Sequence, residues 1–475
     1  MENEIKTKIR NEEKQMPVNS FDDYPMSWKP ILKNEKNPIY IELANNLEED
    51  IRKGILTPGT KLPPQRELAD YLDINLSTVT RAFKICEQRG LLCSAVGKGT
   101  FVSSDAASNS VIMLNRKDKN VIEMGAILPN SEINKLSAQC LMDMTTEPDF
   151  YKLLQYGVIE YDDLQIKAAK MWLQYSHLST TKENILFSTG SQNGIFATLC
   201  ALFKHGDRIG TMPTTYPGLK IAAKILGIQL IPLSMKDGKI TKEVLRYAYK
   251  NHNIKGLYFI PDFNNPTSEI LDTKTRKMIA DFCEENALPI IEDGIYTLYR
   301  KDPLPSIASF TKNQGIFISS VSKALTPGLR LAVLHTPVSY NQAIKESLYA
   351  MQITPPALLL QLFTRLVISK RFEEIRRLRM KDVLIRNQIF DEIMVDQITC
   401  GNQYSPIRWL TLPDHYTSDE FEKIALSENI QIYGAGRFTV GTSVIPNAIR
   451  ISLLSAQPIE LYRAGLKKLH TLITK

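Results

Sequence analysis

The sequence has few cysteines, few histidines and no long apolar run, and each shortage excludes a class of protein. Its six cysteines are widely spaced and form no C-x-x-C pair. This spacing argues against a disulfide scaffold and a structural zinc site, and it favours a reducing, cytoplasmic environment. The six histidines show no metal-ligand spacing. No run of about 18 uncharged apolar residues occurs, so we expect no membrane span, and the charged N-terminal residues do not resemble a secretory signal.

The bulk composition is that of a globular protein, but it leaves the function open. The chain has 475 residues, of which 43% are hydrophobic. At roughly 100–200 residues per domain, this length allows two to four domains. The 58 basic residues exceed the 51 acidic ones by a formal net charge of +7. So small a surplus does not decide between a nucleic-acid binder and a small-molecule enzyme.

Shifts in composition divide the chain into four parts. Residues 1–36 are a polar arm without a sustained period, which we expect to be loosely ordered. Residues 37–104 hold three short periodic segments and a hairpin pattern. Small polar and charged residues at 105–119 indicate a linker. From residue 120 to 475, apolar runs alternate with helical periods. We therefore expect one small domain, a linker and one large α/β unit.

The small domain shows three helices followed by a β-hairpin. An apolar face with spacings of 3 and 4 precedes Gly54 and predicts the first helix. The second helix is expected from about residue 65 to 72. Ser77 is the expected N-cap of the third, which runs to about residue 88 with Val79, Phe83 and Cys86 facing inward. An alternating stretch around residues 97–99 predicts the hairpin.

Two short helices joined by a tight turn form a helix-turn-helix pattern, and the hairpin after them is then a wing. The second of these helices can enter a major groove and present four residues to base edges: Ser77, Thr78, Thr80 and Arg81. Arg66 and Lys98 suit contacts with phosphates. Eight basic and eight acidic residues cancel over 37–104, so charge alone leaves open a small helical domain without a role in DNA binding.

Motif similarity favours DNA binding. Residues 62–102, LPPQRELADYLDINLSTVTRAFKICEQRGLLCSAVGKGTFV, resemble the GntR-type winged helix, with the pattern L-P-x-x-R-x-L-A followed later by G-x-G-T-F-V. The resemblance implies an α+β winged helix-turn-helix that binds double-stranded DNA. Thr78 stands where the family often has a larger basic residue, which affects the operator sequence rather than the mode of binding.

Polar residues follow the apolar runs of the large unit. The runs at 185–187, 257–260, 289–291 and 315–318 predict buried parallel strands, and the ends of such strands are where α/β sheets bind ligands. Taken singly, these polar groups have plain alternatives: connecting turns at 189–192 and 264–267, a helix cap at Asp293 and a solvated lysine at Lys323. The basic stretch 370–386 is expected to be a solvated helix face, with a surface for DNA as the alternative.

Together, the strand ends supply a glycine-containing anion nest, hydroxyls, an amide, a carboxylate, a phenol, a lysine and an arginine. This set suits pyridoxal 5′-phosphate (PLP). A lysine amine forms a Schiff base with its aldehyde, and a carboxylate keeps the pyridine nitrogen protonated. Backbone N–H groups, hydroxyls and an arginine bind its phosphate.

Residues 120–475 resemble a fold-type I aminotransferase, through the motifs at 320–330 (S-x-S-K-x-L-x-P-G-L-R), 261–267 (P-x-x-N-N-P-T) and 293–296 (D-x-x-Y). The family implies an α/β fold with a mostly parallel sheet in a large domain, and a small α+β C-terminal subdomain. It also implies that Lys323 is the catalytic Schiff-base lysine. Implied phosphate contacts come from Gly190, Ser191, Gln192, Ser320, Ser322 and Arg330. Implied contacts with the cofactor ring come from Tyr216, which stacks on it, from Asn265 and Tyr296 at the 3′-oxygen, and from Asp293 at the pyridine nitrogen.

Other matches and departures concern the substrate. N-A-I-R-I-S at 447–452 resembles the family's carboxylate motif and implies that Arg450 clamps an α-amino acid. Ser268 replaces the family's glycine after N-P-T. The segment that begins at Tyr156-Gly157 lacks the family's second glycine and has Gln165 in place of its arginine.

A winged helix followed by an aminotransferase-like domain resembles the MocR subgroup of GntR regulators. The resemblance implies a homodimeric transcription regulator that binds operator DNA and senses an amino acid or PLP. Two alternatives stay open: an active aminotransferase with a DNA-binding appendage, and a cofactor-free regulator that has kept the fold.

Overall fold

The computed structural model describes residues 26–32, 38–95, 99–103, 120–157, 160–235 and 238–475. The chain divides into two units, residues 1–108 and 109–475. The expected linker and Lys98 lie outside the described residues, as does most of the expected arm.

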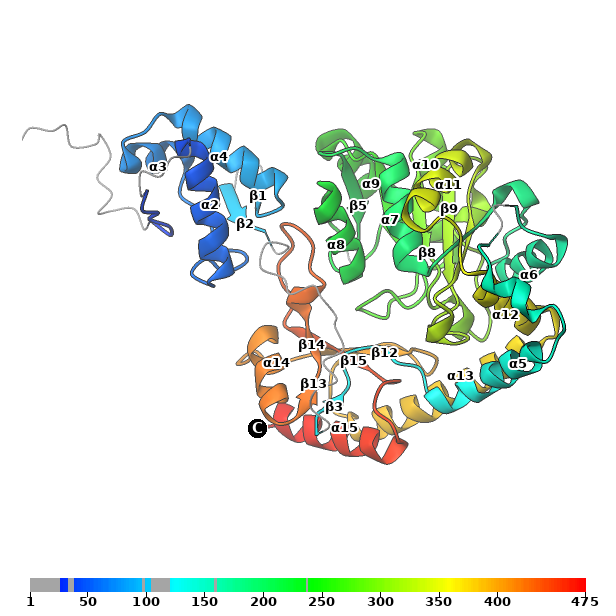
Figure 1. Ribbon diagram of the computed structural model, residues 1–475. Helices are drawn as coiled ribbons and strands as arrows, with labels where there is room; N and C mark the ends of the chain where they lie inside the picture. Colours follow the sequence, from blue (N-terminus) through cyan, green and yellow to red (C-terminus); the bar gives the residue numbers. More distant parts are fainter. Residues whose placement is uncertain (1–25, 33–37, 96–98, 104–119, 158–159, 236–237) are drawn as a thin grey trace, which may run out of the picture. The chain divides into compact units, whose positions relative to one another are not determined.

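The N-terminal unit contains the expected three helices and hairpin (Figure 1). The helices are α2 (Ile39–Arg52), α3 (Gln65–Leu72) and α4 (Leu76–Gln88). Strands β1 (Leu92–Ala95) and β2 (Gly99–Val102) pair antiparallel, with Leu92 opposite Val102. The prediction of an inward face on the third helix is confirmed, because Val79, Phe83 and Cys86 are buried in the core of the unit.

The start of α4 differs from the expectation. Asn75, rather than Ser77, is the N-cap, and its Oδ1 accepts a hydrogen bond from the Ser77 backbone N–H at 2.8 Å. Asparagine caps helices as well as serine does. The helix therefore begins at the first of the two possible caps, Asn75, and not at Ser77. Asp73, with φ of 52°, ends α3 in the left-handed conformation and makes the turn between the two helices.

The described end of the expected arm packs on the N-terminal unit. Trp28 is only 3% exposed and belongs to the core of this unit. Its Nε1 donates to Asp50 Oδ2 at 2.9 Å. The expectation of a loosely ordered arm is therefore wrong for residues 26–32. The apolar residues Met26, Trp28 and Leu32 in this arm were the signal for the contact.

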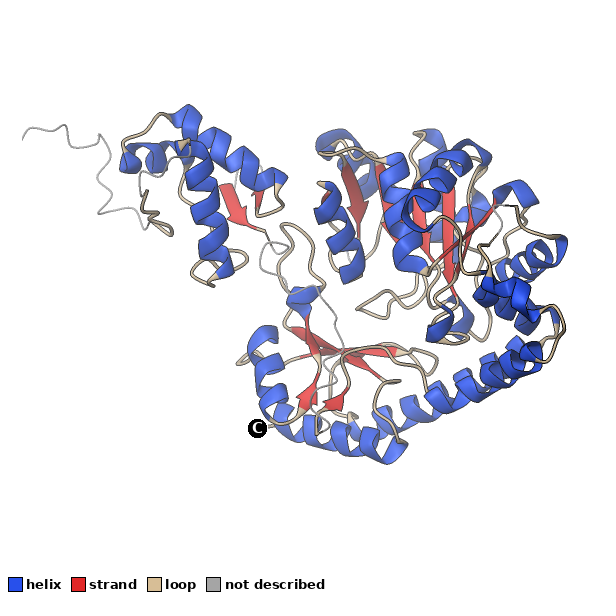
Figure 2. Ribbon diagram, viewed as in Figure 1, coloured by secondary structure: helices blue, strands red, loops and turns tan. Residues whose placement is uncertain are grey.

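The C-terminal unit is built on a seven-stranded sheet with helices on both faces (Figure 2). Its strands, in spatial order, are β4 (Ile185–Ser188), β10 (Ala332–His335), β9 (Gly315–Ser320), β8 (Ile290–Asp293), β7 (Gly256–Phe259), β5 (Arg208–Thr211) and β6 (Gln229–Pro232). All four predicted strands are present. One pairing differs, because β4 contacts only β10 and runs antiparallel to it. All other pairs except β9–β10 are parallel.

Helices connect and cover these strands. They are α5 (Lys135–Thr145), α6 (Asp163–Gln174), α7 (Ser191–Leu202), α8 (Pro217–Leu226), α9 (Lys242–His252), α10 (Thr273–Glu285), α11 (Val338–Gln352) and α12 (Ala357–Ile368). The inner residues of the sheet and helices form the buried cores. This packing fixes the strand ends, from which the polar loops emerge.

A smaller subdomain completes the unit. Its antiparallel sheet has the order β11 (Thr399–Cys400), β12 (Ile407–Thr411), β15 (Ala448–Ser452) and β14 (Tyr433–Gly434). Helices α14 (Ser418–Ser427) and α15 (Ile459–Ile473) belong to it. Its strand β13 (Ile430–Gln431) pairs in parallel with β3 (Ile122–Glu123), which comes from the start of the unit.

Helix α13 (Arg371–Ile393) runs from beside α12 to α15 (Figure 1). It contains most of the basic stretch 370–386. Arg377 and Lys381 are exposed, as expected of a solvated face, but two other arginines of the helix are buried. Arg379 donates to Leu325 O at 2.7 Å, and Arg386 donates to the carbonyls of Leu453 and Ala456, each at 2.9 Å. These arginines join the two parts of the unit.

Candidate functional site

Lys323 lies in the loop that follows β9. Ser320 ends the strand, and its Oγ accepts from the Ser322 backbone N–H at 3.2 Å. The Tyr299 hydroxyl donates to Lys323 O at 2.8 Å. The Lys323 ammonium donates to Ile127 O. Desolvation lowers the pKa of Lys323 to about 7, and the positive charges of Arg450, Arg330 and Arg379 add to this effect. Near neutral pH, a large share of this amine is therefore unprotonated and nucleophilic.

Gly190, Ser322 and Arg330 meet at the N-terminus of α7. Gly190 precedes the helix with φ of +91°, and a Cβ there would lie 2.7 Å from Arg330 Nη2. Arg330 Nη1 donates to Ser322 Oγ at 3.3 Å. Ser191 begins the helix, where backbone N–H groups are free to bind an anion. The arrangement combines a helix N-terminus, a hydroxyl and a guanidinium, which suits a phosphate.

Gln192, in the first turn of α7, has one amide atom in a structural hydrogen bond and the other without a partner. Its Nε2 donates to Gly218 O at 2.9 Å. Its Oε1 is buried and has no hydrogen-bond partner. The Nε2 bond ties α7 to α8.

Asp293 ends β8 in a buried environment. Its Oδ2 accepts from the Tyr258 hydroxyl at 2.9 Å, and its Oδ1 accepts from the Ile295 backbone N–H at 3.1 Å. Burial raises the pKa of Asp293 to about 6, against the opposing effect of these hydrogen bonds. A cationic ring nitrogen beside this carboxylate would stabilise its charged form.

Tyr216 and Tyr296 are close enough to Asp293 to respond to its charge. Burial, followed by the Asp293 charge, raises the pKa of Tyr216 to about 12. Burial also raises the pKa of Tyr296. Sequence reasoning missed Tyr258, the hydrogen-bond donor to Asp293. A hydroxyl inside the apolar run 257–260 was its only signal.

Arg450 comes from the other subdomain, on β15, and is 1% exposed. Its Nη1 donates to Asn265 Oδ1 at 2.7 Å, and its Nη2 donates to Gly125 O. Its Nε is buried without a partner. The rings of Phe438 and Tyr433 lie 4.7 and 5.4 Å from the guanidinium. Desolvation lowers the pKa of Arg450. A buried cation with a free N–H is suited to a carboxylate ligand.

The departures from the family motif have local explanations. Gln165 forms a capping box with Asp162 at the start of α6, with bonds of 2.8 and 3.1 Å. It therefore has a structural role. Tyr156 is 85% exposed. Ser268 Oγ donates to Ile407 O at 3.1 Å, so the serine in place of glycine joins its loop to β12.

The expected DNA-contacting residues cluster on α3 and α4. Arg66, Ser77, Thr80 and Arg81 are exposed, and Thr78 is partly exposed. The Thr80 hydroxyl donates to Gln65 Oε1 at 2.8 Å. The Arg81 guanidinium lies 4.3 Å from the Tyr40 ring centroid. These contacts orient two of the expected readers of DNA.

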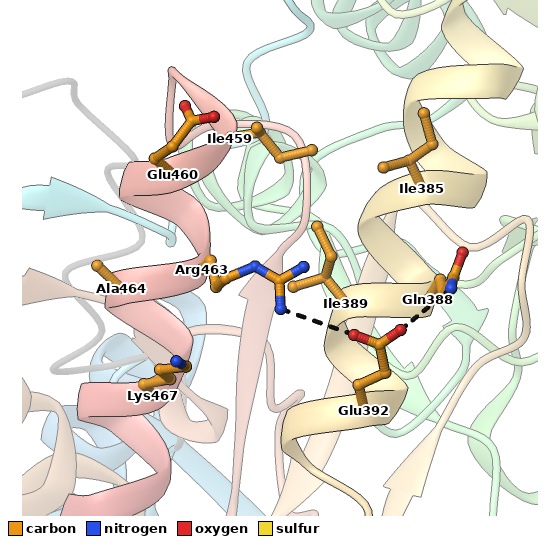
Figure 3. A pocket seen from close by; sticks show the side chains of 9 residues that line it. All are labelled: Ile385, Gln388, Ile389, Glu392, Ile459, Glu460, Arg463, Ala464 and Lys467. Atoms are coloured by element: carbon orange, nitrogen blue, oxygen red, sulfur yellow. Dashed lines mark hydrogen bonds and ion pairs between the residues drawn. The ribbon is translucent and has the colours of Figure 1, made fainter.

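A cavity of about 500 Å³ lies away from these residues, between α13 and α15 (Figure 3). Ile385, Ile389 and Ile459 give it an apolar lining, and an ion pair of 3.6 Å joins Arg463 to Glu392. None of the expected site residues lines it.

Within the described ranges, no group of three or more His, Cys, Asp or Glu side chains could hold a metal ion. No helix in this part of the chain is both long and apolar enough to cross a membrane.

Comparison with known proteins gives the family of each domain. Residues 39–102 match the model for bacterial regulatory proteins of the gntR family, and residues 124–469 match that for aminotransferase class I and II. The chain is 44% identical over 458 residues to "Uncharacterized HTH-type transcriptional regulator YdeF" of Bacillus subtilis (strain 168), across 96% of this chain and 99% of that protein. It is 23% identical over 330 residues to the "HTH-type pyridoxine biosynthesis transcriptional regulator PdxR" of Corynebacterium glutamicum, across 66% and 69%.

Solved structures agree on the fold. The α-aminoadipate aminotransferase LysN from Thermus thermophilus superposes with a TM-score of 0.66 at 21% identity, across 75% of this chain and 92% of that one. A multiple substrate aminotransferase from Thermococcus profundus gives a TM-score of 0.68 at 18% identity, across 77% and 97%. The chain therefore belongs to the aminotransferase class I and II family, and it joins that domain to a gntR-family DNA-binding domain, the combination expected of the MocR subgroup.

Proposed function

We propose that the chain is a transcription regulator that binds operator DNA through its winged helix and binds PLP in its aminotransferase-like domain, where an amino acid or PLP itself is the signal. The observation that carries this proposal is the convergence of Lys323, Asp293 and Arg450. They come from separate elements, yet the charges of Arg450 and Arg330 act on Lys323, and those of Asp293, Arg330 and Arg450 act on Tyr216. The regulator names of the relatives YdeF and PdxR support the DNA-binding role.

The residues around Gly190 fit a phosphate group. The Arg330 guanidinium occupies the space that a Cβ at Gly190 would take, so the glycine lets this cation lie against the N-terminus of α7. The first turn of α7 offers N–H groups, Ser320 and Ser322 offer hydroxyls, and Arg330 offers a guanidinium.

The remaining residues fit a pyridine ring with an aldehyde. Asp293 is a buried carboxylate, and burial raises its pKa to about 6. A positively charged ring nitrogen beside it would offset this cost of burial. In this proposal Tyr216 stacks on the ring, and Asn265 and Tyr296 bind its 3′-oxygen. When bound, PLP supplies an aldehyde that amines attack and a ring that takes up electrons. Lys323 provides the amine, and Arg450 orients an amino acid by its carboxylate.

We further propose that the chain is a homodimer. Several large apolar side chains are exposed on the C-terminal unit, among them Tyr151, Leu154, Tyr156 and Ile353. A Cβ at Gly157 would lie 2.7 Å from Pro355 O, so the segments that carry Tyr156 and Ile353 are neighbours on the surface, and a contiguous exposed apolar patch is typical of a protein interface. A two-fold dimer matches a palindromic or repeated operator.

Two measurements test the proposal. Borohydride treatment of the PLP-incubated protein, followed by peptide mass spectrometry, should place a pyridoxyl group on Lys323. A Lys323→Ala variant should lose this adduct, and Lys277→Ala, an exposed lysine on α10, should keep it. A gel shift on the gene's upstream DNA, at several salt concentrations and with or without PLP and amino acids, should show binding that weakens with salt. Absence of DNA retention under every condition contradicts the proposal.

An active aminotransferase is the second candidate, and one observation favours it. A pKa of about 7 lets Lys323 both accept and release a proton near neutral pH. Steady keto-acid formation from amino-acid and keto-acid pairs, at ordinary enzyme rates, would favour turnover over sensing.

A further inference from the structure

Residues 124–130 form a strap that crosses from the smaller subdomain to the larger one. The strap begins directly after β3, where the Met124 backbone N–H donates to Gln431 O at 2.8 Å and Met124 O accepts from the Ser452 N–H at 2.7 Å. It leads into the short helix η1 (Ser131–Asn134). Its residues 124–127 are buried. Buried carbonyls need hydrogen-bond partners, so the partners of this segment define its position.

Three consecutive carbonyls of the strap accept hydrogen bonds from side chains. Gly125 O accepts from Arg450 Nη2, Ala126 O accepts from Ser455 Oγ, and Ile127 O accepts from Lys323 Nζ. The backbone N–H groups of Gly125 and Ala126 donate to Glu123 Oε1 at 2.8 and 2.7 Å.

Two of these three donors are the residues assigned above to the ligands. An amine that has bonded to the cofactor no longer donates to Ile127 O. A carboxylate bound at the free Nε of Arg450 leaves the Nη2 bond to Gly125 O in place. Loss of the Lys323 bond leaves the buried carbonyl of Ile127 without this partner, which is unfavourable. The cofactor and the strap therefore compete for Lys323, whereas Arg450 and Ser455 stay with the strap.

We propose that the strap is the element that reports occupancy of the site: the cofactor releases it by taking Lys323 from Ile127 O, and its movement reaches β3, the first strand of the C-terminal unit. This inference rests on the proposed function. The inference is based on the order of the chain. Strand β3 directly precedes the strap, and only Asn120 and Val121 separate β3 from residues 104–119. A ligand shifts such an equilibrium only through interactions that differ between the two states. The hydrogen bond from Lys323 to Ile127 O is one such interaction, because it is present only when the amine is not bonded to the cofactor.

Hydrogen exchange on the full-length protein tests the inference. PLP should speed exchange of the strap amides about fivefold, the effect of losing one typical hydrogen bond. A Ser455→Ala variant should show fast exchange without PLP and a smaller further change with it. Its DNA affinity should respond to PLP less than half as strongly as that of the parent. The matched control is Ser427→Ala, which removes a hydroxyl that donates to Ile424 O at 2.8 Å on α14.

The outcomes separate this inference from the proposed function. Borohydride labelling of Lys323 first establishes that PLP is bound. If Lys323 is labelled but strap exchange does not change, the strap inference is overturned and the proposed function stands. It is also overturned if the Ser455→Ala protein, folded by circular dichroism, responds to PLP as the parent does. If no label forms, the proposed function fails, and the inference fails with it.

Discussion

Replacing Gly190 by alanine should weaken PLP binding and lower stability by two separate effects. The residue has φ of +91°, a conformation that L-residues rarely adopt. We expect this strain to lower the free energy of unfolding by ~1–3 kcal/mol, with or without ligand. The new Cβ would also lie 2.7 Å from Arg330 Nη2 and push the guanidinium away from the helix N-terminus.

The displaced guanidinium sets the expected loss of affinity. A hydrogen bond to a charged group contributes about 1.5–3 kcal/mol. Loss of one such bond to the phosphate corresponds to a roughly 10- to 150-fold higher Kd for PLP. Titration of the apoprotein with PLP, followed by absorbance, measures the Kd, and chemical denaturation of the same protein measures stability.

A matched variant in the same region controls for the added methyl group. Gly328 lies in the short 3-10 helix η6 (Pro327–Leu329) after Lys323, and a Cβ there would meet no atom within 4 Å. Gly328→Ala should therefore leave the Kd within about threefold, a change of under 1 kcal/mol. If Gly190→Ala binds PLP as tightly as the parent does, Gly190 and Arg330 do not hold the phosphate.

Four further predictions concern separate features. The rate of PLP capture should rise as the pH passes about 7, where the Lys323 amine loses its proton, and then level off; a rate that keeps climbing tenfold per pH unit above 8 indicates an ordinary lysine. Asn75→Ala should lower the stability of the N-terminal unit by about 1 kcal/mol in calorimetry, and Ser77→Ala should have little effect; equal losses contradict the capping assignment. Arg66→Ala should weaken binding to operator and unrelated DNA alike and reduce the salt slope by about 1; a loss confined to the operator contradicts the assigned phosphate contact. Leu154→Glu should shift the mass measured by light scattering from dimer to monomer, and an unchanged mass places the interface elsewhere.

The sequence predicted the elements of the fold well where the local pattern was strong. The helix at 65–72 and the strands at 185–187 and 315–318 appear close to their predicted bounds, because apolar periodicity and chain breakers act locally. The helix at 76–88 began earlier than predicted because Asn75 and Ser77 compete as caps. The pairing of β4 with β10 could not be predicted, since it depends on a strand more than 140 residues away.

For the candidate site, the sequence predicted which residues take part but not which atoms they contact. Lys323, Asp293 and Arg450 were identified from motifs, but their partners were not. Tyr258 and the carbonyls of the strap reach the site through tertiary packing, and backbone carbonyls carry no sequence signal at all. The buried arginines of α13 were mistaken for surface charges because composition does not show which carbonyls a guanidinium will meet.

The pairing of β3 with β13 also sets an order of events during synthesis. The winged helix is complete once residue 103 has been made, and its contacts are local. Strand β3 follows soon after, yet its partner at Ile430 is made about 300 residues later. At roughly 5–20 residues per second, β3 waits about 15–60 s for that partner. The DNA-binding domain can therefore fold well before the subdomain that supplies Arg450 is closed.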